Sequence, residues 1–120
     1  MNRGEQEPMP GRASSSTYKI RIGDGAPTYL MSSALPDGRL GEVFINQAKL
    51  GTYARGMTDA FARLLSISLQ HGVPLERLCD AFIETKFEPA GFVEGDSEIT
   101  TCDSTVDYIF RRLKADYLES

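Results

Sequence analysis

The cysteines and the single histidine are the side chains best suited to covalent, redox or metal chemistry. The chain contains Cys79, Cys102 and His71 and no other residue of these two types. A redox pair or a zinc site would need a Cys-x-x-Cys motif or a Cys/His cluster, and neither spacing is present. Cys79 falls on a helical apolar stripe, which favours a buried thiol, while the role of Cys102 stays open. His71 precedes a glycine at the end of a predicted helix, where an imidazolium interacts favourably with the helix dipole. We therefore expect no metal and no cofactor.

Two motifs resemble binding sites for phosphate or for DNA. The segment Ile22-Gly23-Asp24-Gly25 contains Gly-x-Gly, but no third glycine and no predicted helix follow it, so a hairpin turn is favoured. Residues 70–76 join two predicted helices through a short glycine turn, as in a helix-turn-helix reader of DNA. The second helix offers Glu76, Arg77 and Asp80 rather than several cations and amides. Simple packing of the two helices is therefore favoured over DNA recognition.

Three segments are candidates for binding a partner protein. The run Lys86-Phe87-Glu88 places an aromatic ring between opposite charges on a predicted loop, and binding residues gather on loops. The same run is explained equally well as a connecting segment without a binding role, which Phe87 anchors to the domain. A second segment is the turn that precedes Arg39, and a third is a short basic cluster whose alternative interpretation is ordinary solvated surface. The partner-binding candidates are Arg39, Lys86, Phe87, Glu88, Arg111 and Arg112.

Composition and charge restrict the classes of function. The 120 residues correspond to one domain with one modest core, too few for a catalytic barrel and a cofactor domain. Thirteen basic against seventeen acidic residues give a net charge of −4, which provides no general attraction for nucleic acid or an anionic membrane. No apolar run approaches the roughly 18 residues that span a bilayer, and the N-terminus lacks the apolar region of a secretory signal. We expect a cytoplasmic protein that binds neither nucleic acid nor membrane.

The domain that positions these candidates is predicted to begin after a polar arm. Residues 1–16 carry Gly, Pro, Ser, Glu and Gln with almost nothing to bury, which predicts a disordered N-terminal arm before a domain over 17–120. Apolar residues then alternate with polar ones in three short segments separated by glycine-containing turns. The predicted strands are 18–22, 28–31 and 42–45.

Three helices are predicted to follow these strands. Apolar residues recur at three- and four-residue spacing over 52–71, over 74–84 and from Asp103 or Ser104 to Tyr117. The stripe that we expect the first helix to turn toward the sheet is Tyr53, Met57, Ala60, Phe61, Leu64, Leu65 and Ser68. The order of elements predicts an α+β fold, in which a three-stranded antiparallel meander is covered on one face by three helices.

Three segments carry a resemblance to a known family. They read DGRLGEVFI, GVPLERLCDAFIETKFEPAGFVEGD and TVDYIFRRL, in this order. This order and spacing resemble the segment that follows the catalytic barrel in adenosylcobalamin-dependent (class II) ribonucleotide reductases, a region related to the TSCPD domain. The similarity covers about residues 18–118, and its most specific part is TKFEPAGFVEGD followed by DYIFRRL.

The resemblance implies an accessory domain that is not an enzyme. Class II reductases make deoxyribonucleotides with a thiyl radical inside a large barrel and use cysteine pairs as reductants, and none of these parts maps onto this chain. No catalytic residue of the family is carried over.

The leading hypothesis is a stand-alone, non-catalytic relative of that domain that binds a protein. The partner is a reductase subunit, as in a split reductase for deoxyribonucleotide synthesis, or a regulator. The alternatives are a small helix-turn-helix transcriptional regulator that uses helices 52–71 and 74–84, and a nucleotide-sensing domain. The sequence predicts no oligomeric state.

Overall fold

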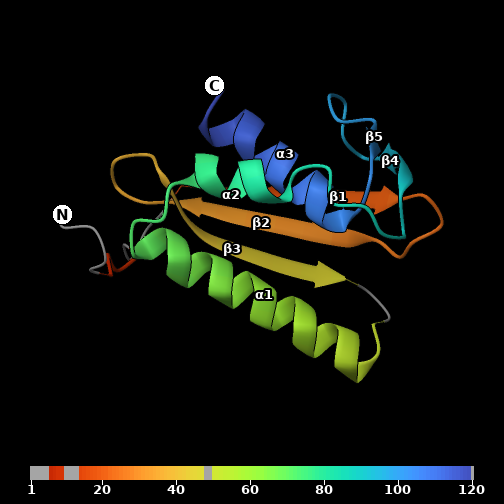
Figure 1. The fold of residues 1–120 in the computed structure, drawn as a ribbon, viewed down its shortest axis with the longest axis horizontal. Helices are drawn as coiled ribbons and strands as arrows, with labels where there is room; N and C mark the ends of the chain where they lie inside the picture. Colours follow the sequence, from red (N-terminus) through yellow and green to blue (C-terminus); the bar gives the residue numbers. More distant parts are fainter. Residues whose placement is uncertain (1–5, 10–13, 48–49, 120) are drawn as a thin grey trace.

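A five-stranded antiparallel sheet forms the framework of the molecule (Figure 1). The computed structural model describes residues 6–9, 14–47 and 50–119. The strand order is β3-β2-β1-β4-β5, so the first three strands form a meander and β4 joins it beside β1. The strands are β1 (Ser15–Ile22), β2 (Thr28–Ala34), β3 (Leu40–Gln47), β4 (Gly91–Glu94) and β5 (Thr101–Cys102).

Alternation along the strands gives the sheet one buried and one open face. The buried side chains of the meander include Ile20, Ile22, Leu30, Val43 and Ile45. The neighbours of these residues along the strands point to solvent, among them Lys19, Tyr29, Met31 and Phe44. The predicted meander is confirmed, and the structure adds two strands to it. These additions are four and two residues long, too short for a period-2 pattern to predict them.

Three helices complete the α+β fold and confirm the predicted fold class. They are α1 (Thr52–Gln70), α2 (Leu75–Phe82) and α3 (Thr105–Tyr117). Ser104 caps the N-terminus of α3, where its side chain accepts a hydrogen bond from the backbone N–H of Asp107 at 3.0 Å. Helices α2 and α3 pack against each other, while α1 runs alongside β3 at the edge of the sheet (Figure 1). Their buried side chains form a single core with the strands.

The predicted inward stripe of α1 is mostly wrong. Tyr53, Met57, Ala60 and Leu64 are exposed, although Leu65 is buried as predicted. The buried residues of the helix are Ala62, Leu65, Ser66, Leu69 and Gln70. This face includes two polar side chains, and a pattern based on hydrophobic residues alone therefore favours the wrong side of the helix.

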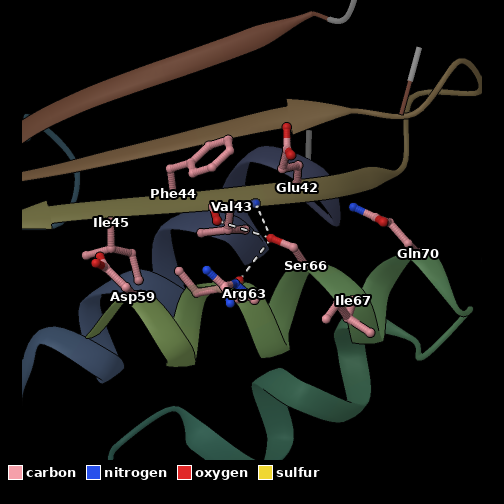
Figure 2. A pocket seen from close by; sticks show the side chains of 10 residues that line it. Glu42, Val43, Phe44, Ile45, Asp59, Arg63, Ser66, Ile67 and Gln70 are labelled. Carbon is pink, nitrogen blue, oxygen red and sulfur yellow. Dashed lines mark hydrogen bonds between the residues drawn. The ribbon is translucent and has the colours of Figure 1, made fainter. Parts of the chain in front are cut away.

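Two polar side chains of α1 bond to the free edge of β3. The Ser66 hydroxyl accepts the backbone N–H of Val43 at 2.9 Å and lies 3.1 Å from its carbonyl oxygen, as Figure 2 shows. Four residues later, Gln70 Nε2 donates to the carbonyl oxygen of Gly41 at 3.0 Å. Four residues of a helix rise about 6 Å and two residues of a strand about 6.6 Å. The spacing of the two side chains on α1 therefore matches the spacing of the backbone groups that they bond on β3. Helix α1 thus covers an edge that would otherwise be open to pairing with another chain.

The N-terminal segment makes contacts where it is described. Strand β1 begins at Ser15, within the range predicted as an arm. The backbone N–H of Glu7 donates to the carbonyl oxygen of Gln70 at 2.8 Å. Residues 1–5 and 10–13 lie outside the described residues, and the division into an arm over 1–16 and a domain over 17–120 stays a prediction.

Candidate functional site

The most specific motifs of the sequence meet in a buried ion network. Arg112 Nη1 lies 3.0 Å from both carboxylate oxygens of Asp96, and the Tyr108 hydroxyl donates to the same carboxylate at 2.9 Å. Burial alone would raise the pKa of Asp96, but backbone N–H groups of Ile99 and Glu98 and the Arg112 guanidinium outweigh it and hold that pKa below its usual range. The network therefore fixes the loop after β4 to α3 through an ion pair that is charged at neutral pH.

Arg112 is enclosed on its other sides as well. Its Nη2 donates to Glu98 and to Asp116, both at 2.9 Å. The ring of Tyr18 lies over the guanidinium, 4.8 Å from the central carbon to the ring centroid. Burial and the Asp116 carboxylate raise the pKa of Tyr18 to about 12. Arg112 was predicted as part of a surface patch, and this prediction is wrong because only 4% of its side chain is exposed.

A second buried carboxylate ties the loop after α2 to the start of α3. Asp107 accepts the backbone N–H of Glu84 at 2.7 Å and that of Asp103 at 2.9 Å. Glu84 has a φ of 74°, a left-handed conformation that few residues other than glycine adopt. The Ser104 hydroxyl donates to the carbonyl oxygen of Thr85 at 2.6 Å. These bonds set the path of the chain immediately before Lys86, Phe87 and Glu88.

The loop positioned in this way forms one wall of an apolar groove. The backbone N–H of Phe87 donates to the carbonyl oxygen of Asp103 at 3.2 Å, and its ring remains 47% exposed. The groove has a volume of about 420 Å³ and opens between β3, the N-terminal half of α1, the loop and the start of α3. Its lining residues are Ile45, Gln47, Met57, Thr58, Phe61, Phe87, Glu88, Pro89, Thr105, Val106 and Ile109. We call it the Phe87 groove.

The lining of the Phe87 groove is largely apolar. Glu88 is the one ionisable side chain in its lining, and the lining contains no cysteine, histidine, lysine or arginine. Within the described ranges, no three His, Cys, Asp or Glu side chains are grouped to hold a metal ion. The groove is suited to take up an apolar side chain.

The predicted partner-binding residues are not all brought together. Phe87 and Glu88 line the groove, and the exposed Lys86 precedes them on the same loop. Arg39 lies elsewhere, on the exposed turn after β2, where it pairs with Asp37 at 2.6 Å and Glu7 at 2.7 Å.

Arg111 and Arg112, predicted as one patch, have different environments. Arg111 is half-buried and donates to the carbonyl oxygen of Thr101 at 2.7 Å, whereas Arg112 is buried. Prediction from the sequence missed the groove residues from α1 and α3, Met57 and Val106 among them. The apolar spacing of these residues indicated a core position. The groove beside them depends on how β3, α1, the loop and α3 are arranged in space, which the sequence pattern does not show.

A second pocket lies between β3 and α1 (Figure 2). Its volume is about 390 Å³, and its charged lining side chains are Glu42, Asp59 and Arg63. Ser66 also lines it, but the hydroxyl already bonds to the backbone of Val43 and lies 2.9 Å from the carbonyl oxygen of Ala62. The lining contains no histidine that could activate this serine.

Both cysteines are buried free thiols. Burial raises the pKa of Cys79 to about 11, and its Sγ lies 3.6 Å from the carbonyl oxygen of Phe110. Burial also raises the pKa of Cys102. A raised thiol pKa disfavours the thiolate that redox exchange and nucleophilic attack require.

Comparison with known proteins assigns the chain to a family. The model of the TSCPD domain matches residues 5–117. The chain belongs to the TSCPD domain family. Its relatives include the vitamin B12-dependent ribonucleotide reductases of Agrobacterium fabrum, 45% identical over 114 residues, and Bradyrhizobium diazoefficiens, 44% identical over 114 residues. Each match covers 95% of this chain and 9% of the reductase. The reductase of Streptantibioticus cattleyicolor is 42% identical over 92% of this chain and 18% of its own length.

These matches confirm the resemblance predicted from the sequence. The chain spans less than a fifth of the length of the reductases it matches. No solved structure is significantly similar to it. Among the described residues of the TSCPD domain, no helix is long and apolar enough to cross a bilayer.

Proposed function

We propose that this TSCPD domain is a non-catalytic accessory module that binds a protein, and that its partner is the catalytic region of a vitamin B12-dependent ribonucleotide reductase. The domain contributes to deoxyribonucleotide synthesis through the enzyme that it binds. Its relatives carry a homologous domain within reductase chains, which supports a reductase as the partner.

The Phe87 groove is the single observation that carries this proposal. The motifs TKFEPAGFVEGD and DYIFRRL contain three buried polar residues, Asp96, Asp107 and Arg112. These residues form hydrogen bonds within the domain and position the loop and the helix beside the groove. The groove itself is open, largely apolar and bordered by the exposed Lys86 and Glu88. An apolar centre with a charged rim is the usual composition of a protein-binding surface.

The proposal is tested with a reductase that lacks its own copy of this domain. The reductase of Agrobacterium fabrum is truncated to remove the segment that matches this chain, and the purified TSCPD domain is added back. We expect the two proteins to sediment together, and Phe87→Ala to weaken the complex. Sedimentation of the two proteins as separate species at every concentration would contradict the proposal.

A further inference from the structure

Helix α1 carries an apolar stripe on the side that faces away from its own domain. Tyr53 is 81% exposed, Met57 57%, Leu64 65% and Ile67 43%, and the small Ala60 lies between them. In Figure 1, α1 lies along the outer edge of the molecule, with no other element on its far side. We call these five residues the outer seam.

The spacing of the outer seam is that of a coiled coil. Successive members are separated by four, three, four and three residues, which is the alternation of the a and d positions in a heptad repeat. Four large apolar side chains in one stripe about 21 Å long differ from the scattered apolar residues of an ordinary surface. The inward face of the same helix, including Ala62, Ser66 and Leu69, lies on the opposite side and is fully used by β3 and the core.

The charges beside the outer seam permit a second copy of the same chain. The positions that flank a heptad seam are occupied by Ala54, Gly56, Phe61, Arg63, Ser68 and Gln70. None is acidic, although the chain contains seventeen acidic residues and carries a net charge of −4. Charges at the flanking positions of a coiled coil normally favour a partner helix of opposite charge. Here Arg63 is the only charged flanking residue, so the flanking positions do not exclude an identical helix. Two acidic chains can therefore approach along this surface without repulsion between acidic side chains at the flanking positions.

The seam is also self-complementary in shape when two helices run antiparallel. A twofold axis beside Ala62 places Met57 of each copy opposite Ile67 of the other, and Ala60 opposite Leu64. Each contact then joins residues of different shape, and the small Ala60 accommodates the larger Leu64. In a parallel pair, by contrast, Ala60 would face Ala60 and leave a gap. The antiparallel axis also places Arg63 and Asp59 of the two copies on one rim of the contact, where each Arg63 lies about 3 Å along the helix axes from the level of Asp59 of the other copy.

We propose that two copies of this domain associate through their outer seams, packed antiparallel about a twofold axis. The contact is isologous, because the same residues contribute from both copies. It involves one helix from each copy, so its area falls at the lower end of specific interfaces, and the dimer is expected to dissociate on dilution. This inference goes beyond the proposed function and does not rest on it, because the Phe87 groove and the outer seam share only Met57.

Sedimentation equilibrium over a range of concentrations tests the dimer. We expect the unmodified domain to shift from monomer to dimer as concentration rises, and Leu64→Glu to remain a monomer because it places a charge in the contact. Phe92→Glu is the matched control, since Phe92 is 82% exposed on β4 and should leave the dimer intact. A domain that stays monomeric throughout, or Leu64→Glu that dimerises like the unmodified domain, would overturn the proposal.

Disulfide trapping tests the orientation and does not depend on how Leu64→Glu folds. Ala60→Cys mixed with Leu64→Cys should form a cross-linked pair, because these residues face each other across the axis. Tyr53→Cys should not cross-link to itself, since its two copies lie about 27 Å apart along the antiparallel helices. The two native cysteines are buried and give little background. Efficient cross-linking of Tyr53→Cys with none between positions 60 and 64 would indicate a parallel pair and overturn the antiparallel assignment.

Discussion

Arg112 and Asp96 form an ion pair in which both side chains are almost fully buried. Nη1 of the arginine lies 3.0 Å from each carboxylate oxygen, and the exposed fractions of the two side chains are 4% and 2%. Asp96 ends the motif TKFEPAGFVEGD, and Arg112 lies in DYIFRRL. The two most specific motifs of the chain therefore meet in a structural contact.

Removing one partner of this pair should destabilise the domain strongly. Asp96→Ala leaves a buried guanidinium without its main counter-ion, and a loss of about 3–5 kcal/mol in the free energy of unfolding is expected. Urea denaturation followed by circular dichroism measures the change. Asp37→Ala is the control, because it breaks an exposed ion pair with Arg39 and should cost far less. Equal losses in the two variants would contradict the structural role of Asp96.

The same carboxylate predicts how stability depends on pH. The folded-state pKa of Asp96 lies below its ordinary value of about 3.9, so its contribution is complete above that value and is lost as the pH falls through the folded pKa. The free energy of unfolding should therefore fall on acidification below about pH 4, and part of this slope should be absent in Asp96→Asn. Urea titrations at a series of acidic pH values measure both slopes. Identical slopes would show that Asp96 is not held ionised in the folded state.

Two serines on α1 provide a matched test of the covered sheet edge. The Ser66 hydroxyl bonds to the backbone of Val43, whereas the Ser68 hydroxyl donates to the carbonyl oxygen of Leu64 in its own helix. Ser66→Ala leaves a buried N–H and a carbonyl on β3 unsatisfied, which should cost about 1–3 kcal/mol. Ser68→Ala should change the free energy of unfolding little. Thermal or urea unfolding compares the two, and an Ser66→Ala variant as stable as Ser68→Ala would contradict the account of this edge.

The buried thiols should be inert in the folded protein. Burial raises the pKa of both cysteines, and of Cys79 to about 11, so at neutral pH each is a protonated thiol shielded from reagents. We expect Ellman's reagent to modify neither thiol in the native domain and to modify both in denaturant. Rapid stoichiometric reaction of the native domain would instead indicate an accessible thiolate and reopen a redox role.

The sequence predicted the regular elements well because their residues alternate or recur with a clear period. The strands through Ile20, Leu30 and Val43 and the start of α3 at Ser104 agree with the structure. The short strands β4 and β5 contain too few residues for a period to appear. Their pairing also depends on contacts across a long separation in the chain, such as Arg21 with Glu94.

The exposed surface was harder to predict than the regular elements, because some polar side chains are buried and some apolar side chains are exposed. Arg112 was expected in solvent and is buried by its acidic partners. The stripe of α1 containing Met57 and Leu64 was expected inside and is exposed, since Ser66 and Gln70 turn the opposite face of the helix toward β3. Phe87 lies exposed on a loop, and its role in binding a partner stays a prediction, while the groove beside it arises only from the tertiary arrangement.

The central claim is that the Phe87 groove binds the catalytic region of a vitamin B12-dependent reductase. Isothermal titration of the TSCPD domain into the truncated Agrobacterium fabrum reductase tests it most directly, with Phe87→Ala and Phe92→Ala compared side by side. Both residues are exposed aromatics, but Phe92 lies on the open face of the sheet, away from the groove lining. We predict that Phe87→Ala weakens binding by about tenfold or more and that Phe92→Ala leaves it unchanged. Absence of binding by the unmodified domain, or equal affinities for the two variants, would contradict the claim.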